Sequence, residues 1–291
     1  MVYLILSSRG RRESCLKNSK QYILIIPVII AIGLFLILPL GEIVLSTIFT
    51  GKTNFDYWSF FKDSDNQLVI LRTLKIAVIT TIGTLLLSLP TALWISRQTS
   101  SFRKALSIII LFPILTNSVV RNFTWIIILG KNGIINKLML AMHIIKAPLA
   151  LLYTDFSIIL GSIYLFLPIM ITSLVSSLSE LNVEVEEAGS VLGASPLTNF
   201  WKVILPQLSV GILTGVVLVF TGAMTAYTTP QILGGNKHLV MSTLIYQQAL
   251  TLGDWTKASA IAVILIGLTV GTLVLVKAGT KIIERRSAQS A

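Results

Sequence analysis

Residues 179–207 read SELNVEVEEAGSVLGASPLTNFWKVILPQ and separate two long apolar segments. The stretch is much longer than a tight turn, and it carries its own signals for starting and ending helices. A polar segment of this length, placed between stretches that can cross a membrane, predicts an ordered element that protrudes from the bilayer. Such an element is suited to being held by another protein, so we expect the function of the chain to depend on what it docks into.

The first half of this segment predicts a short amphipathic helix. Asn182 fits the N-cap position, and the glutamates that follow it fall in the first turns, where the helix dipole favours negative charge. One apolar face follows the helical period, and Gly193 then predicts the end of the helix. The members of this face are Leu181, Val185, Ala188 and Leu192.

A second helix is predicted to start at Ser195-Pro196, with serine as the N-cap and proline at the first helical position. Its apolar stripe runs toward the next span, and Pro206 is expected to interrupt it. Two helices joined by small residues at 193–195 form a bent knob whose backbone another protein can approach closely. A rigid knob between two spans can also transmit force to them. The alternative is an ordinary helical hairpin on the membrane surface.

The composition is that of a membrane protein. Charged residues make up 12% of the 291 residues, against about 25% in soluble domains, and 54% are hydrophobic. The net charge of +11 does not indicate nucleic-acid binding, because the basic residues are scattered over loops and tails and form no stripe. Cys15 is the single cysteine, which excludes an intramolecular disulfide. His143 and His238 lack neighbours at metal-ligand spacing, so we expect no metal site. The sequence also shows no nucleophile–base pair and no complete phosphate-binding loop, so we expect no catalytic residue and no bound cofactor.

Six segments are long and apolar enough to cross the hydrocarbon core, which takes about 20 residues. They run over 23–48, 74–95, 105–129, 156–178, 208–232 and 258–276. The third segment is the least regular, and we expect it to break into a short helix and an external segment. The residues that interrupt it are Pro113, Thr116, Asn117, Arg121 and Asn122. The sequence therefore predicts an all-α, multi-pass membrane protein.

Basic residues indicate the orientation of the chain, because they favour the cytoplasmic side of a membrane. Both tails, 1–21 and 282–291, are basic, and so is the short loop that contains Arg97, Arg103 and Lys104. The first apolar run is too long for a secretory signal, so we interpret it as an uncleaved span. An even number of spans then places both termini and the 179–207 segment in the cytoplasm.

The polar segment contains a spaced motif. EAG occupies 187–189, Gly193 follows after three intervening residues, and VILP at 203–206 follows after nine more. This resembles the EAA motif of permease subunits of ATP-binding-cassette (ABC) importers, which reads E-A-A, three residues, G, nine residues, I-x-L-P. The spacing matches throughout. Gly189 replaces the second alanine and Val203 replaces isoleucine. Glycine weakens a helix by roughly 1 kcal/mol relative to alanine, so we expect softer coupling here.

The resemblance runs from about Leu71 to Lys281 and implies a type I ABC importer permease with the MetI-like fold. It implies a path formed with a second permease subunit, a solute delivered by an extracytoplasmic binding protein, and a separate ATPase dimer that holds ATP and Mg. By carry-over, Glu187 is the main polar contact of the coupling element. The coupling residues are Glu187, Ala188, Gly189, Gly193, Ala194 and Pro206.

On this basis the chain divides into four parts. A basic tail (1–21) precedes a first span with its outer loop (22–70). The permease domain (71–281) contains the coupling loop 179–207, and a second tail (282–291) follows it.

The chain is not expected to hydrolyse ATP itself. Gly51-Lys52-Thr53 matches the end of a phosphate-binding Walker A pattern, but Ser46 replaces its first glycine and no strand precedes it. An ion-coupled secondary transporter is the alternative of a different class; it would need ionisable groups within the spans and often repeat symmetry. No nucleophile–base pair in the sequence supports the alternative that the chain is a membrane enzyme. A receptor or structural subunit would co-purify with partners without supporting flux.

Four further stretches resemble the permeases of spermidine/putrescine importers, with less specificity than the EAA spacing. They are PILTN at 113–117, RNFTW at 121–125, LGKNGIIN at 129–136 and YTTPQILGG at 227–235, and Gln247-Gln248 and Asp254-Trp255 follow them. The resemblance implies a polyamine cargo. Permeases for other small solutes share these stretches in part, so the same role for another small solute is the alternative.

A path for a flexible polycation should offer carboxylates and aromatic faces. The candidates in the outer half are Glu42, Trp125, Asp155 and Tyr227. Each has an ordinary alternative: Glu42 paired or at a water-facing helix end, Asp155 capping the fourth span, and the two aromatic residues anchoring the membrane interface. Arg121 would repel a polyamine from a pore, so we expect it to pair with a carboxylate or to have a structural role.

Two glycine pairs at helical spacing, Gly211/Gly215 and Gly267/Gly271, allow helices to approach closely in lipid. Packing within the chain and contact with a second permease subunit explain this spacing equally well.

Overall fold

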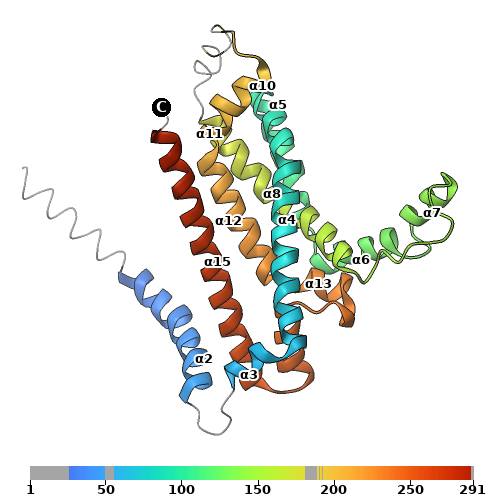
Figure 1. Ribbon diagram of the computed structural model, residues 1–291, viewed down its shortest axis with the longest axis vertical. Helices are drawn as coiled ribbons and strands as arrows, with labels where there is room; N and C mark the ends of the chain where they lie inside the picture. Colours follow the sequence, from blue (N-terminus) through green and yellow to red (C-terminus); the bar gives the residue numbers. More distant parts are fainter. Residues whose placement is uncertain (1–25, 50–55, 181–188, 190, 192, 290–291) are drawn as a thin grey trace, which may run out of the picture.

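The computed structural model describes residues 26–49, 56–180, 189, 191 and 193–289. All regular elements in these ranges are helices (Figure 1). Four helices are by themselves long and apolar enough to cross a membrane, and the number rises to six if each of two bent helix pairs is one span. The all-α, multi-pass architecture predicted from the sequence is therefore confirmed.

The spans run between two ends of the molecule, called here the upper and lower ends as drawn in Figure 1. Helix α4 (Ser64–Ser96) rises to the upper end and α5 (Ser100–Leu115) descends from it. Helix α8 (Asp155–Ser179) rises, α12 (Ser209–Thr225) descends and α15 (Trp255–Gln289) rises again. The short helices α10 (Pro196–Asn199) and α11 (Leu205–Gln207) lie at the upper end. Three other short helices lie at the lower end: α3 (Tyr57–Lys62), α13 (Thr228–Leu233) and α14 (Met241–Tyr246).

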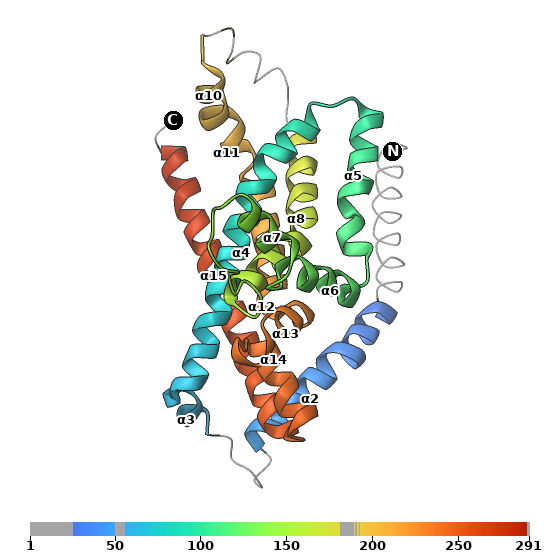
Figure 2. The same cartoon turned by 90° about the vertical axis from the view of Figure 1, so that its right-hand side faces the viewer.

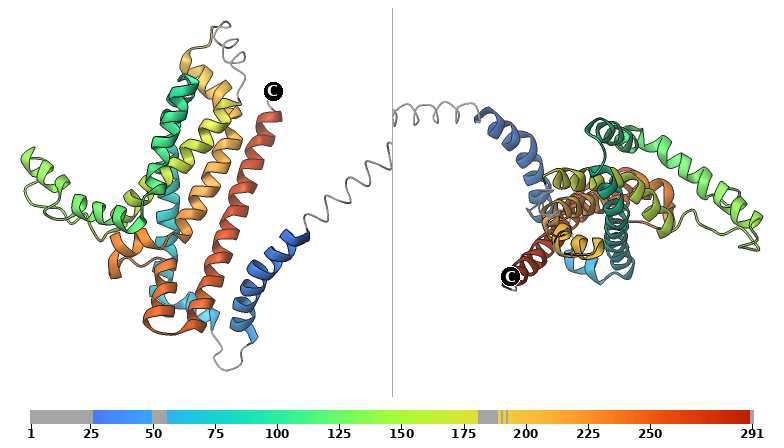
Figure 3. Two further views of the ribbon diagram at one scale, coloured as in Figure 1. Left: turned by 180° about the vertical axis from the view of Figure 1, so that it is seen from behind. Right: turned by 90° about the horizontal axis from the view of Figure 1, so that it is seen from above.

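The first span, Ile26–Leu45, lies at the side of the bundle. It contains a π-helical segment, Gly33–Ile37, and continues into α2 (Leu38–Phe49), which contacts α15. On the other side of the bundle, an arm formed by α6 (Ser118–Leu129) and α7 (Ile134–Ala141) extends away from α2 (Figure 3).

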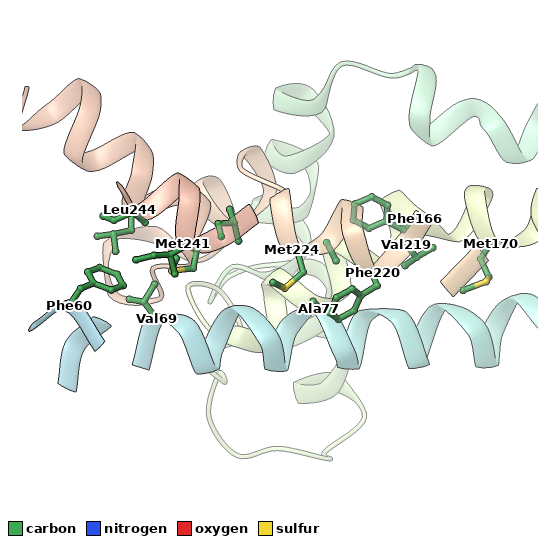
Figure 4. Packing of buried hydrophobic residues seen from close by; sticks show 14 of the residues in the cluster. Phe60, Val69, Ala77, Phe166, Met170, Val219, Phe220, Met224, Met241 and Leu244 are labelled. Atoms are coloured by element: carbon green, nitrogen blue, oxygen red, sulfur yellow. The ribbon is translucent and has the colours of Figure 1, made fainter. Parts of the chain in front are cut away.

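The hydrophobic core lies between α4, α8 and α12, which pack against one another along their lengths (Figure 4). Its members include Ala77, Phe166, Met170, Val219, Phe220 and Met224, and it continues to Phe60, Val69, Met241 and Leu244 at the lower end. Small residues bring α12 close to α8, since a Cβ atom at Gly211 would collide with Ser177 and one at Gly215 with Met170. The first glycine pair therefore serves packing within the chain. No described atom lies within 4 Å of a Cβ position at Gly267 or Gly271.

The third span breaks as predicted. Helices α5 and α6 meet at an angle of 88°, and Asn117 caps α6 by accepting from the amide of Val119 at 2.9 Å. Arg121 is buried beside the break and donates from Nη1 to the carbonyl oxygens of Pro113 (2.7 Å) and Thr116 (3.4 Å). The structural role expected for Arg121 is thus what the geometry shows, and among the described residues Nη1 of Arg121 binds carbonyls, not a carboxylate.

Three span boundaries differ from the prediction. The second span begins at Ser64, because Asp63 caps a polar first turn that extends beyond the apolar run. The sixth span starts earlier than predicted, at Trp255, and ends at Val276 as predicted, although its helix continues to Gln289. The fifth ends at Thr225, since the backbone of Ala226 leaves the helical conformation (φ −58°, ψ 128°) and its carbonyl accepts from Ser242 Oγ at 2.5 Å.

The segment after the fifth span forms the lower end of the molecule. It comprises α13 (Thr228–Leu233), a 3₁₀ turn (Gly235–Lys237), α14 (Met241–Tyr246) and a π-helical turn (Gln247–Thr251). The carbonyl of Leu233 accepts from Tyr153 N at 3.0 Å and from Ser157 Oγ at 2.9 Å. These bonds fix the segment to the start of α8.

Candidate functional site

The bend of the polar segment lies at the upper end, beyond the ends of α4 and α8 (Figure 1). Gly193 has a φ of +83°, in the left-handed region that glycine adopts without strain, and the amide of Ala194 donates to the carbonyl of Gly189 at 3.1 Å. This six-residue closure is the Schellman motif that ends helices. The predicted helix stop at Gly193 is confirmed. Two coupling residues, Glu187 and Ala188, lie outside the described residues.

The second helix also starts where it was predicted. Ser195 Oγ accepts from the amide of Thr198 at 3.2 Å, and α10 (Pro196–Asn199) follows it. A π-helical turn (Phe200–Ile204) leads into α11 (Leu205–Gln207), which contains Pro206. The chain then bends by 66° into α12. Because of this bend, the helical segment before Leu208 points away from the fifth span but is joined directly to it.

Apolar side chains surround the bend without being covered. Val191 is 86% exposed, Leu197 is 70% exposed and Trp201 is 60% exposed. No described atom lies within 4 Å of the position that a Cβ atom at Gly193 would take. An apolar surface around an open glycine turn is typical of an interaction site. Leu197 and Trp201 belong to the apolar stripe predicted for the second helix, but the pattern alone did not indicate that they are exposed.

Tyr227 pairs with a second tyrosine at the lower end. Its ring lies 4.7 Å from that of Tyr246, with an angle of 31° between the ring planes. Burial raises the pKa of Tyr227 to about 12, and a hydrogen bond with Tyr246 acts in the same direction. Tyr227 therefore stays neutral at physiological pH, and the two rings form an aromatic pair with hydroxyl groups.

The other aromatic candidate, Trp125, packs edge-on against Tyr164 of α8, with ring centroids 5.8 Å apart. Glu42 is exposed on α2, on the opposite side of the bundle from the α6–α7 arm (Figure 3). The structure therefore does not bring the four path candidates together in one site within this chain.

Asp155 stands at the centre of an ion-pair cluster at the lower end. Its carboxylate lies 3.3 Å from Nε of Arg72, 3.0 Å from Nζ of Lys75 and 2.7 Å from Nδ1 of His238. Arg72 also donates to the carbonyl of Leu239 at 3.1 Å. The cluster joins α4, α8 and the loop before α14. The N-cap of α8 is Thr154, so Asp155 does not cap this span.

Comparison with known proteins identifies the family of this chain. Residues 78–288 match the family described as binding-protein-dependent transport system inner membrane component. The chain belongs to this family. The match spans α4 to α15 and includes the Gly193 bend, so the permease role and the fold implied by the EAA spacing are confirmed.

Among its relatives, the permease is 31% identical to the spermidine/putrescine transport system permease protein PotB of Haemophilus influenzae over 262 residues, which are 87% of this chain and 91% of that protein. Its fold resembles a bacterial ABC transporter involved in the import of the acidic polysaccharide alginate, with a TM-score of 0.76, 17% identity, and coverage of 93% of this chain and 98% of that one. A second structure of the alginate transporter, in complex with a periplasmic protein bound to an alginate pentasaccharide, gives a TM-score of 0.72, 18% identity, and coverage of 93% and 97%.

The structure gives a reason for one departure of this permease from the EAA motif. A Cβ atom at Gly189 would lie 2.8 Å from Oδ1 of Asn199, a side chain that is 4% exposed. Glycine at this position lets the two arms of the bend approach each other. Asn199 was not predicted to have a role. The signal in the sequence is its place as a polar residue at the end of the first turn after Ser195, directly before the apolar pair Phe200-Trp201.

Proposed function

We propose that this permease is the membrane subunit of an importer for spermidine, putrescine or a similar polyamine. Its relationship to PotB supports the polyamine cargo. The similarity to a transporter solved with a periplasmic binding protein supports delivery of the solute by such a protein. In this proposal a second permease subunit completes the path, and the chain binds no cofactor of its own.

In this proposal, the energy of ATP hydrolysis by the partner subunit is transmitted to the permease through the bend at Gly193. An ATPase dimer, which holds ATP and Mg, contacts the exposed apolar surface around Gly193, and Gly189 and Ala194 shape its backbone. Glu187 and Ala188 complete this contact, and Pro206 lies at the joint with α12. The Schellman closure at 3.1 Å and the exposed Val191 and Leu197 are the observations that support this contact.

The orientation follows from the same contact. The upper end, which carries the bend and the end of α15, lies on the cytoplasmic side of the inner membrane, whereas the lower end receives the binding protein. Both termini are then cytoplasmic. The basic loop between α4 and α5, which lies at the upper end, agrees with this orientation.

The outer part of the path is assigned to aromatic faces. Tyr227 offers a neutral aromatic pair with Tyr246, and Trp125 offers a second ring; both suit an ammonium cation. Glu42, exposed on α2, supplies a carboxylate if the second permease subunit covers this face. The carboxylate of Asp155 already has three basic neighbours, so its geometry favours holding the lower end together.

Uptake by the reconstituted assembly tests the proposal. The permease is co-expressed with the ATPase, second permease and binding protein encoded with it, and placed in proteoliposomes. We expect labelled spermidine to enter only with binding protein outside and ATP at the ATPase face. Uptake driven by a proton gradient without ATP would support the ion-coupled alternative instead. ATP-dependent uptake of another solute in place of polyamines would contradict the cargo assignment alone.

A further inference from the structure

A groove with a volume of about 450 Å³ opens along α8, between α5 and α12. Figure 2 shows α5 standing beside α8, and none of the sixteen described residues of α5 is buried. The groove lies in the upper half of the spans, since its walls reach Glu180 at the end of α8 and Val210 at the start of α12. Its volume is within the range of roughly 300–1,000 Å³ for small-molecule sites.

The polar lining of the groove lies mainly on one face of α8. These residues recur at the helical period and are joined by one threonine from α12. They are Thr172, Ser173, Ser176, Ser177, Glu180 and Thr214. Leu111 and Ile114 of α5 form the apolar wall opposite. No lysine or arginine is among the described lining residues, although the whole chain has a net charge of +11.

Three of these hydroxyl groups present only acceptors to the groove. Thr172 donates to the carbonyl of Pro168 at 2.9 Å, Ser173 donates to the carbonyl of Gly211 at 2.9 Å, and Thr214 donates to the carbonyl of Val210 at 2.8 Å. A hydroxyl whose proton is engaged in this way retains lone pairs that accept hydrogen bonds. A surface of acceptors with a carboxylate at its end suits a ligand that donates, such as an ammonium group, and disfavours an anion.

The same lining is poorly suited to lipid. The hydroxyls of Ser176 and Ser177 make no hydrogen bond to any described residue, and Ser176 is exposed. A hydroxyl without a partner is unfavourable in hydrocarbon, where no water can bind it. This face of α8 therefore requires water or another protein in front of it.

An exposed stripe on α12 continues the groove toward the lower end. Thr214, Leu218 and Thr225 are all exposed, and their spacing keeps them on one side of the helix. Thr225 also donates its proton within the helix, to the carbonyl of Thr221 at 2.9 Å. The stripe ends two residues before Tyr227, so it connects the groove with the aromatic pair at the lower end.

We propose that the groove between α5, α8 and α12 is this chain's share of the inner half of the translocation path, and that it takes a linear polyammonium cation. The second permease subunit closes the groove against lipid. Ammonium groups pass from the aromatic pair along the threonines of α12 to the hydroxyls of α8 and leave past Glu180. This inference rests on the proposed polyamine importer and adds the residues that its cargo contacts.

Cysteine accessibility in the assembled transporter tests this inference. In a Cys15→Ser parent, Ser176→Cys and Thr214→Cys place single thiols in the groove, and Val270→Cys places a control on the exposed side of α15, where the native side chain is 54% exposed. The probe is a cationic methanethiosulfonate reagent added at the ATPase face. Because the thiolate is the reactive form and burial in apolar surroundings suppresses it, we expect both groove thiols to react at least about tenfold faster than the control. Spermidine should slow both reactions.

Each other result overturns a defined part of the inference. Groove thiols that react as slowly as the Val270→Cys control, in variants that still import spermidine, would show that the groove faces lipid. Fast labelling that spermidine does not slow would show an aqueous groove that is not the polyamine path. Two groove positions are used because one substitution alone could prevent assembly. A parent that assembles and hydrolyses ATP but imports no spermidine would contradict the proposed cargo, whereas the labelling rates would still decide whether the groove holds water.

Discussion

Gly193 is the residue whose backbone conformation determines the bend in the coupling loop 179–207, called the coupling segment below. A residue with a Cβ atom pays about 1–2 kcal/mol in the left-handed region, and a large side chain would also block the open surface around the bend. We expect Gly193→Leu to abolish ATP-driven uptake while the protein still inserts into the membrane. Uptake by proteoliposomes and the amount of protein in the membrane are the measurements.

Gly253 provides the matched control. It also has a positive φ, +72°, and no described atom within 4 Å of its Cβ position, but it lies near the lower end of the molecule. Gly253→Leu introduces comparable backbone strain away from the coupling segment, so we expect it to leave uptake largely intact. Equal loss of uptake in both variants would assign the effect to strain and not to docking.

The contact between Gly189 and Asn199 predicts a dependence of one substitution on the other. Gly189→Ala introduces a methyl group 2.8 Å from Oδ1 of Asn199, so we expect it to lower uptake even though alanine favours helix. Replacing Asn199 with serine in the same chain should relieve the collision. In a double-mutant cycle on the thermal stability of the assembly, we expect a coupling of about 0.5–3 kcal/mol. Additive effects would contradict the contact.

Asp155 distinguishes a structural carboxylate from one that contacts cargo. Asp155→Asn removes the charge that holds Arg72, Lys75 and His238 together, and we expect the assembly to lose about 2 kcal/mol of stability, a value lowered by partial exposure of the cluster. Thermal unfolding in detergent is the measurement, with Glu42→Gln as the control. Unchanged stability with impaired uptake would instead favour contact with cargo.

At the scale of elements, local signals predicted the coupling segment and the break in the third span. Gly193 and Ser195-Pro196 determine where helices end and start through bonds that close within six residues, so their outcome could be derived from the sequence. Pro113 and Asn117 likewise act locally on α5 and α6. Elements whose limits depend on bonds within a few residues are the predictable ones.

Elements fixed by distant partners were not predictable. The end of the fifth span depends on Ser242, sixteen residues beyond the carbonyl it binds, and the cluster around Asp155 joins residues from three parts of the chain. The acceptor-lined groove was missed for the same reason, because its polar face appears only when α5, α8 and α12 are placed side by side. Of the path candidates chosen from residue type alone, Glu42 lies on α2, on the opposite side of the bundle from the arm that carries Trp125.

The break between α5 and α6 predicts a role for Arg121 in stability. Arg121→Met keeps the length of the side chain but leaves the carbonyls of Pro113 and Thr116 without this donor. We expect a loss of about 1–3 kcal/mol in stability, measured by thermal unfolding in detergent. Lys137→Met, on the exposed surface of the α6–α7 arm, removes a positive charge without this contact and should have little effect. Similar losses in both variants would contradict the assignment.

At the scale of the whole molecule, the coupling segment is joined to the core through α12. The 66° bend connects α11 directly to this span, and Gly211 and Gly215 hold it close to α8. The hydrogen bond from Ser173 Oγ to the carbonyl of Gly211, at 2.9 Å, links the two helices near the same level. We therefore expect a push on the bend to move α12 and α8 together, and these helices form two walls of the groove.

Cross-linking from the bend tests the central claim most directly, that the segment around Gly193 docks onto an ATPase. A photoreactive amino acid is placed at Leu197, which is 70% exposed, and at Ile134 of the α6–α7 arm as a control. In the intact assembly we expect irradiation to join position 197 to the ATPase subunit and position 134 not to do so. Position 197 joined to the binding protein, or to no ATPase in an assembly that hydrolyses ATP and imports cargo, would contradict the account.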